Sequence, residues 1–280
     1  MEIEPLTGVL GAQVHGVDLA SDISSLVEDL EAAIDSHAVL VFRDQSLTPA
    51  QQVRFSRCFG PYSPDPFVDG IDNNPEVIRV VREADEGDAF NFGGAWHSDW
   101  SFQQPPPAYT TLHALDMPPR GGDTIWTDMR AVYDALPQER RELLDQLTAV
   151  HTARDAYSPK MRAMYDELKG MRILTDERAC EVFHHPLIRV LPRTGRKTLF
   201  FNSGYVKELL GDDLADDEES QLRSWLHNFS TQHQFTFRHR WRDGDVVMWD
   251  NRCTQHFALP DYVGYRRELH RTTIGERATC

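Results

Sequence analysis

Short strands separated by turns dominate the second half of the chain. Strands are predicted at residues 187–191, 197–202, 234–239, 245–249 and 265–274. One helix, beginning near Asp216 with acidic residues in its first turn, interrupts them. A doubly wound parallel fold would need helices alternating with strands and a glycine-rich phosphate turn, and the sequence contains neither. The pattern therefore favours a mainly β fold, a sandwich or jelly roll, flanked by helices.

The first half of the chain supplies most of the flanking helices. Apolar residues at helical spacing predict a helix that ends at His37, and Thr48-Pro49-Ala50-Gln51 is a typical capped start of a second one. Further helices are expected at 129–147. Strands are predicted at 38–42, 76–81 and 108–115, with a short one containing Thr124 and Trp126. Residues 152–180 show no clean period and are interpreted as an insert that could form a lid.

Composition restricts the partners and the compartment. The 280 residues carry a formal net charge of −15, which argues against nucleic acid or an anionic membrane as partner. Four scattered cysteines, no C-x-x-C pair, no secretory signal and no long apolar run predict a cytoplasmic protein. No repeat or linker divides the chain, so one domain over residues 1–280 is expected. The sequence does not determine the oligomeric state, and a homo-oligomer is compatible with it.

Two motifs far apart in the sequence carry metal-binding chemistry. In an extended strand, residues two apart point to the same side, so His97 and Asp99 can present an imidazole and a carboxylate to one point. His256 would complete a face of two histidines and one carboxylate, which suits non-haem Fe(II). The alternative without a metal is that both histidines are core residues hydrogen-bonded to the backbone. The segment Asp250-Asn251-Arg252 is predicted to form a hydrogen-bonded corner that positions His256.

Two arginines near the carboxyl terminus predict an anion site. Arg267 and Arg271 are four residues apart in a strand-like segment, so they share one face with Leu269 and Thr273. Guanidinium groups on an apolar face are costly unless each meets an anion, and arginine binds carboxylates and sulfonates through paired hydrogen bonds. The alternative is that both arginines pair with some of the abundant surface carboxylates.

Six segments together resemble the taurine/2,4-D dioxygenase family, in the family's order and spacing. They are His97-Ser98-Asp99, Phe102-Gln103-Gln104, Gly121-Gly122-Asp123-Thr124, Trp249-Asp250-Asn251-Arg252, Thr254-Gln255-His256 and Arg266-Arg267-Glu268-Leu269-His270-Arg271. Members of that family use Fe(II), 2-oxoglutarate and O₂ to hydroxylate a substrate C–H, releasing succinate and CO₂. The resemblance implies a double-stranded β-helix (jelly roll) and gives His97, Asp99 and His256 the catalytic metal-ligand positions. It assigns Arg267, assisted by Thr124, to the distal carboxylate of 2-oxoglutarate, and Arg271 to an anionic group of the substrate.

The departures from the family pattern concern the substrate. Taurine-specific members carry a histidine and an asparagine where this chain has Pro64-Asp65-Pro66 and Gly93-Gly94. Other segments look more like the phenoxyalkanoate-degrading branch. The expected substrate is a small organic anion, a sulfonate, sulfate ester or aryloxy acid, with a bulkier and less polar tail than taurine. The aromatic residues expected to line its pocket are Tyr62, Phe67, Trp100 and Tyr205.

Two other classes of protein fit part of the pattern. A zinc-dependent hydrolase could use the same ligand face, although no general base such as a His-Glu helix motif lies near the ligands. A non-catalytic anion-binding sensor could keep the fold without turnover, although all three ligands and both arginines are present.

Overall fold

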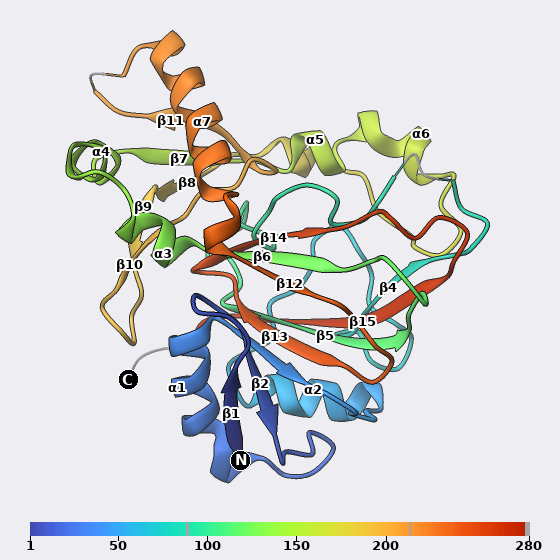
Figure 1. The fold of residues 1–280 in the computed structure, drawn as a ribbon. Helices are drawn as coiled ribbons and strands as arrows, with labels where there is room; N and C mark the ends of the chain where they lie inside the picture. The colour runs from blue at the N-terminus through green and yellow to red at the C-terminus, as the bar shows by residue number, and fades with distance from the viewer. Residues whose placement is uncertain (88–89, 213, 278–280) are drawn as a thin grey trace.

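Two facing sheets form the centre of the molecule (Figure 1). The structure is a computed structural model that describes residues 1–87, 90–212 and 214–277. The larger sheet has the order β1 (Glu2–Pro5), β2 (Ala12–His15), β3 (Val39–Phe42), β13 (Val246–Asp250), β5 (Tyr109–Asp116), β15 (Arg267–Ile274), β4 (Ile78–Arg82). The smaller one has the order β12 (Thr236–His239), β6 (Thr124–Asp128), β14 (Thr254–Ala258). Most neighbours are antiparallel, which confirms the predicted jelly roll with flanking helices.

The central strands β3 and β13 of the larger sheet are buried on both faces, and this explains why they are almost continuously apolar. In β3, Leu40 and Phe42 belong to the hydrophobic cluster under the helices, whereas Val39 and Val41 belong to the cluster between the sheets. Successive side chains of a strand point to opposite faces, so a strand with two buried faces needs apolar residues at every position. The cluster between the sheets also contains Trp126 of β6.

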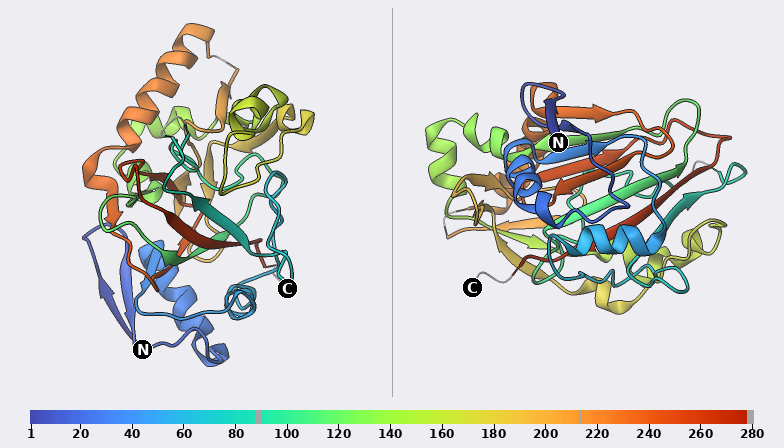
Figure 2. Two further views of the ribbon diagram at one scale, coloured as in Figure 1. Left: turned by 90° about the vertical axis from the view of Figure 1, so that its right-hand side faces the viewer. Right: turned by 90° about the horizontal axis from the view of Figure 1, so that it is seen from below.

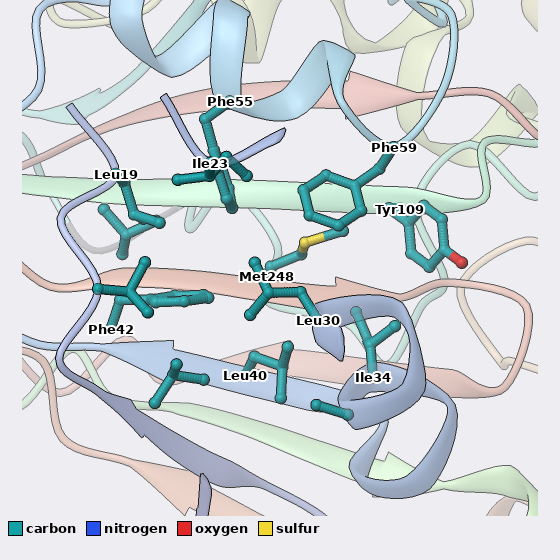
Figure 3. Packing of buried hydrophobic residues seen from close by; sticks show 14 of the residues in the cluster. Leu19, Ile23, Leu30, Ile34, Leu40, Phe42, Phe55, Phe59, Tyr109 and Met248 are labelled. Carbon is teal, nitrogen blue, oxygen red and sulfur yellow. The ribbon is translucent and has the colours of Figure 1, made fainter. Parts of the chain in front are cut away.

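Two helices cover the outer face of the larger sheet. In the right-hand view of Figure 2, α1 (Val27–His37) and α2 (Pro49–Arg57) lie in front of its strands. Thr48 caps α2 as predicted: its hydroxyl accepts from the Gln51 N–H, and the Gln51 side chain accepts from the Thr48 N–H at 2.8 Å. Figure 3 shows side chains of this helical layer, among them Phe55 and Leu30, packed around Met248 of β13.

The remaining elements lie mainly on the other side of the jelly roll, around the smaller sheet. In Figure 1, α7 rises at the upper left, and α5 and α6 lie at the upper right. The strands here are β7 (Thr148–His151), β8 (Phe183–Pro186), β9 (Ile188–Val190), β10 (Lys197–Leu199) and β11 (Val206–Leu210). The helices are α3 (Met129–Asp134), α4 (Gln138–Leu144), α5 (Arg154–Tyr157), α6 (Arg162–Tyr165) and α7 (Asp216–Ser230). Among the described residues, no helix is long and apolar enough to cross a membrane.

Several strands are absent from the sequence prediction. β1, β2, β7, β8, β11 and β14 were not expected, and β14 carries His256. These strands are only four or five residues long, and some are largely polar, as in Thr254-Gln255-His256-Phe257-Ala258, so their local pattern is too short to distinguish them from loops. Hydrogen bonding to β6 makes β14 a strand, which is a tertiary effect. Residues 152–180 contain only short helices, including two single turns of 3₁₀ helix.

Removing one ring from the layer under the helices should destabilise the whole fold. Phe55 is 1 % exposed, and its ring centroid lies 5.8 Å from that of Phe42 and 5.3 Å from that of Phe59. Phe55→Ala should lower the free energy of unfolding by about 3–5 kcal/mol, because it leaves a cavity against the sheet. Denaturant titration measures this change. Val182→Ala is the control: Val182 is 51 % exposed, and a comparable loss there would contradict the expectation.

Candidate active site

The two predicted ligand motifs meet through their backbones. His256 lies on β14, where it pairs with Trp126 of β6. The loop before β5 adds a one-residue bridge beside it: the His97 N–H donates to the His256 carbonyl at 3.0 Å, and the His256 N–H donates to the His97 carbonyl at 2.7 Å. Residues 159 positions apart in the chain are therefore held as antiparallel neighbours, with imidazole centroids 4.1 Å apart.

Three side-chain donors converge at this bridge. One ligand atom from each of His97, Asp99 and His256 lies within 4.8 Å of the other two. The Asp99 Oδ1 is 3.6 Å from Nε2 of His97 and 4.0 Å from Nε2 of His256. His97 Nδ1 lies 2.7 Å from the Ala95 carbonyl, to which it donates, so its Nε2 keeps a free lone pair. Donor type, spacing and tautomer all fit a divalent non-haem metal ion.

The protonation states of the buried ligands also suit a metal ion. Burial, reinforced by the neighbouring His97 and only partly opposed by Asp99, lowers the pKa of His256 to about 3, so this imidazole is neutral at pH 7. Burial alone would raise the pKa of Asp99, but the two imidazoles and Arg271 outweigh it and hold this pKa below its usual range. A neutral imidazole and an ionised carboxylate are the forms that bind metal.

The local structure around Asp99 differs from the predicted strand. Only His97 is in extended pairing; Asp99 and Trp100 lie in a turn, and Trp100 has a φ of +45°. A positive φ is uncommon for a large side chain and occurs where surrounding contacts enforce it. The same-side geometry of an extended strand therefore does not explain how His97 and Asp99 converge. The turn brings the carboxylate back toward the imidazole.

Hydrogen bonds from two elements hold that turn. The Thr110 hydroxyl on β5 donates to Asp99 Oδ2 at 2.7 Å and accepts from Asn251 Nδ2 at 2.8 Å. The Asp99 N–H donates to Asn251 Oδ1 at 3.3 Å, and Ser98 Oγ donates to the Asn251 carbonyl at 2.6 Å. The hydrogen bonds of Asn251 thus position the Asp99 turn. Sequence gave no indication of Thr110, which precedes another threonine in an ordinary strand.

The corner predicted before His256 is built by the two neighbours of Asn251. The Arg252 guanidinium pairs with the Asp250 carboxylate at 2.7 Å, and the Thr254 hydroxyl donates to the Asp250 carbonyl at 2.7 Å.

Arg267 is buried beside the three donors and has no carboxylate partner among the described residues. It is 5 % exposed, and its Nε donates to the Gly122 carbonyl at 3.2 Å. Burial lowers its pKa, as expected of a charge removed from water. Gly122 has a φ of +70°, and a Cβ there would lie 3.2 Å from the Arg267 Nε. A residue without a side chain at this position therefore avoids a steric conflict with the guanidinium group. An unpaired buried guanidinium is costly without an anionic ligand.

Thr124 lies in the same cavity, and its hydroxyl oxygen acts as a hydrogen-bond acceptor. Trp241 Nε1 donates to Thr124 Oγ1 at 2.9 Å, so the hydroxyl proton is free to be donated elsewhere. The cavity is lined by all three donors and by Thr124, Arg267 and Arg271, the six residues that the sequence predicted.

Arg271 is also buried, but it already has a partner. Its Nη2 donates to Asp65 Oδ2 at 2.7 Å, and its Nη1 lies 3.8 Å from Asp99 Oδ1. The guanidinium carbon lies 4.4 Å from the ring centroid of Trp100 and 5.3 Å from that of Phe92. The predicted alternation along β15 is confirmed, because Arg267, Leu269 and Arg271 share its buried face.

A larger, open pocket adjoins the metal face. It encloses about 1220 Å³, counting space open to solvent, and Arg271 and His97 form part of its floor. Trp100, Tyr205 and the Gly93-Gly94 turn line it as expected. The predicted walls Tyr62 and Phe67 do not line it. The Tyr62 hydroxyl donates to the Pro75 carbonyl, and Phe67 stacks on Tyr157 at a centroid distance of 4.6 Å. Phe90, Met161, Met164 and Tyr165 also line this pocket, and the sequence did not predict them.

The chain belongs to the Taurine catabolism dioxygenase TauD, TfdA family, whose model matches residues 2–273. It is a 2-oxoglutarate-dependent non-haem iron dioxygenase, with Fe(II), 2-oxoglutarate (α-ketoglutarate) and O₂ as the implied cofactor and co-substrates. This agrees with the main functional prediction rather than with a zinc hydrolase or a non-catalytic sensor.

Relatives within the family differ in substrate. The chain is 36 % identical to the alpha-ketoglutarate-dependent 2,4-dichlorophenoxyacetate dioxygenase of Cupriavidus pinatubonensis, over 96 % of both chains. It is 32 % identical to the alkylsulfatase of Acinetobacter baylyi, over 100 % of this chain and 86 % of that one. A solved taurine dioxygenase from Burkholderia xenovorans superimposes with a TM-score of 0.81 at 31 % identity, covering 98 % of this chain and 88 % of that one.

Removing the Thr110 hydroxyl should weaken metal binding without unfolding the protein. Thr110→Val deletes the hydrogen bond to Asp99 Oδ2, and losses of this kind cost about 10–100-fold in metal affinity. The measurement is the rise in melting temperature with added Mn(II). Thr111→Val is a matched control, because the Thr111 hydroxyl is equally buried and has no hydrogen-bond partner in the described chain. Equal metal affinity in the two variants would contradict the role given to Thr110.

Proposed function

We propose that the chain hydroxylates a C–H of a small organic anion that binds at Arg271, beside the face formed by His97, Asp99 and His256. The observation that carries this proposal is the convergence of three metal-type donors in a cavity that two buried arginines also line. Bound Fe(II) supplies the activation of O₂ that drives decarboxylation of 2-oxoglutarate and oxidation of the substrate. The protein's own contribution is position, charge and exclusion of water.

Arg267 and Thr124 bind the distal carboxylate of 2-oxoglutarate. Both line the cavity with the three donors, and each has an unused donor: the uncompensated guanidinium and the free hydroxyl proton. The cation–π neighbours of Arg267, Trp241 at 6.0 Å and Tyr262 at 5.7 Å, restrict the direction in which the guanidinium can point. The co-substrate's other end is then directed toward the metal face.

Arg271 binds the anionic group of the prime substrate, and the open pocket takes its apolar tail. Phe90, Met161, Met164 and Tyr165 give the pocket walls that are apolar and adaptable. Met161, Met164 and Tyr165 belong to the insert 152–180, which supports its proposed role as a lid. The named relatives acting on 2,4-dichlorophenoxyacetate, alkyl sulfates and sulfate esters support substrates of this kind.

The remaining predictions concern the protein in its cell. We propose a single catalytic domain over residues 1–280 and a cytoplasmic location. The cytoplasmic location is supported by the described cysteines Cys58, Cys180 and Cys253, which are free thiols. That the protein has no nucleic-acid partner stays a prediction from its net charge. That it forms a homo-oligomer also stays a prediction.

The two arginines should give separable kinetic defects. Arg267→Ala should raise the apparent constant for 2-oxoglutarate by the equivalent of about 2–4 kcal/mol, the scale for losing one partner of a desolvated charge pair. Arg271→Ala should spare 2-oxoglutarate and raise the constant for the prime substrate. Steady-state succinate release with each compound varied in turn distinguishes them. The reverse pattern would mean that the two roles are exchanged.

A substrate screen tests the proposed function directly. Aryloxyacetates and longer alkyl sulfates or sulfonates should stimulate succinate release more than taurine does, because an apolar pocket gains from burying their tails. His97→Ala, Asp99→Ala and His256→Ala are controls, and each should abolish stimulation while keeping the melting temperature near that of the metal-free protein. A taurine efficiency about tenfold above every bulkier anion, roughly 1.4 kcal/mol of transition-state preference, would refute the preference. Undiminished turnover in any ligand variant would refute that residue's role.

A further inference from the structure

The ion pair between Asp65 and Arg271 is built into the pocket rather than formed at its surface. The two side chains are 1 % and 4 % exposed, and Nη2 of Arg271 donates to Oδ2 of Asp65 at 2.7 Å. The other carboxylate oxygen accepts from the backbone N–H groups of Phe67 at 2.8 Å and Val68 at 3.0 Å. Both oxygens of Asp65 are therefore used, and the loop holds the carboxylate in place.

Two of the three guanidinium nitrogens of Arg271, Nε and Nη1, have no hydrogen-bond partner in the described chain. The Nε is buried, although Arg271 lines both the metal cavity and the open pocket. A buried N–H without an acceptor is unfavourable, so this donor indicates where a ligand oxygen belongs. The rings of Trp100 and Phe92 lie against the guanidinium, and Asp65 holds its Nη2. Asp65 therefore occupies one guanidinium nitrogen, and Nε and Nη1 are left for substrate.

The charges around this donor balance before any substrate binds. With the proposed ligands in place, the positive charges of Fe(II) and Arg267 equal the negative charges of Asp99 and 2-oxoglutarate. Arg271 is likewise offset by Asp65. Burial raises the pKa of Asp65 to about 6 while Arg271 opposes that rise, so the carboxylate is mainly ionised at pH 7.5. A substrate anion therefore meets a buried ion pair with almost no net charge, where each further negative charge is unfavourable.

We propose that Asp65 is a specificity-determining residue that restricts the Arg271 subsite to organic monoanions and excludes dianions of the same shape. Sulfate monoesters, sulfonates and carboxylates carry one negative charge and are accepted. Phosphate monoesters carry about −1.5 to −2 near pH 7 and are rejected. Asp65 acts through Arg271 by offsetting its charge and occupying its Nη2. This inference rests on the proposed function, because it assumes that the substrate anion binds at Arg271.

The test compares hexyl sulfate with hexyl phosphate, which have the same tail and the same tetrahedral head group. Binding is measured by calorimetry at pH 7.5 on the protein loaded with Ni(II) and 2-oxoglutarate, so that no turnover is required. The wild-type protein should bind the sulfate at least about tenfold more tightly, a modest effect for juxtaposed like charges. Hexyl H-phosphonate, a monoanion built on phosphorus, should bind like the sulfate. Equal wild-type affinities for sulfate and phosphate would overturn the proposal without any variant.

Asp65→Asn then tests the residue itself. The variant keeps the shape and removes the charge, so hexyl phosphate should bind about tenfold more tightly than to wild type, and the preference for sulfate should shrink. Asp69→Asn is the matched control: it makes the same charge change at an exposed position of the same loop and should leave the preference unchanged. An undiminished preference in Asp65→Asn, or an equal loss in Asp69→Asn, would overturn the role of Asp65.

Two further measurements distinguish a failure of this proposal from a failure of the proposed function. Arg271→Ala should weaken both the sulfate and the phosphate; phosphate binding that survives this change would place the anion elsewhere and overturn the inference. Succinate release with Fe(II) reports the proposed function independently. If no anion stimulates it while the charge preference and its loss in Asp65→Asn are observed, the proposed reaction fails and the monoanion subsite stands.

Discussion

The pairing of His97 with His256 is the contact on which the active site depends. Two backbone hydrogen bonds join a loop to strand β14 and place both imidazoles on one side of it. Without this bridge the loop would have no fixed register against the smaller sheet, and Asp99 would not reach the same point. The jelly roll contributes the rigid partner: β14 is itself paired along its length with β6. The ligand face is therefore as rigid as the sheet that carries it.

The same architecture keeps the charged groups of the site in an apolar interior. Arg267 and Arg271 project from β15 on the face that also buries Leu269, between the two sheets. There a charge is tolerated only with a partner, and the two arginines differ in this respect: Arg271 has Asp65, whereas among the residues that the structure describes Arg267 has only a carbonyl. That difference in partners is the structural basis for giving the two residues different ligands.

Most of the fold and of the candidate site could be predicted from local patterns, and the failures have a common cause. The capped helix at Thr48, the doubly buried strand at 39–42 and the alternation along 267–271 are local signals and were found. The strand carrying His256 and the turn at Asp99 were not, because pairing and hydrogen bonds with distant segments impose them. Two of the four predicted aromatic walls were misplaced for the same reason, since loop side chains take their direction from neighbours.

The sequence by itself determined which groups exist for chemistry: two imidazoles, a carboxylate and two arginines on one strand face, in an order typical of one enzyme family. Only the tertiary structure decided which of those groups are already neutralised. Asp65 and Arg271 are 206 residues apart, and nothing local in either segment indicates that they meet. The physical reason is that burial brings distant charges together in a medium that screens them weakly, so the charge accepted by the site is a property of the fold.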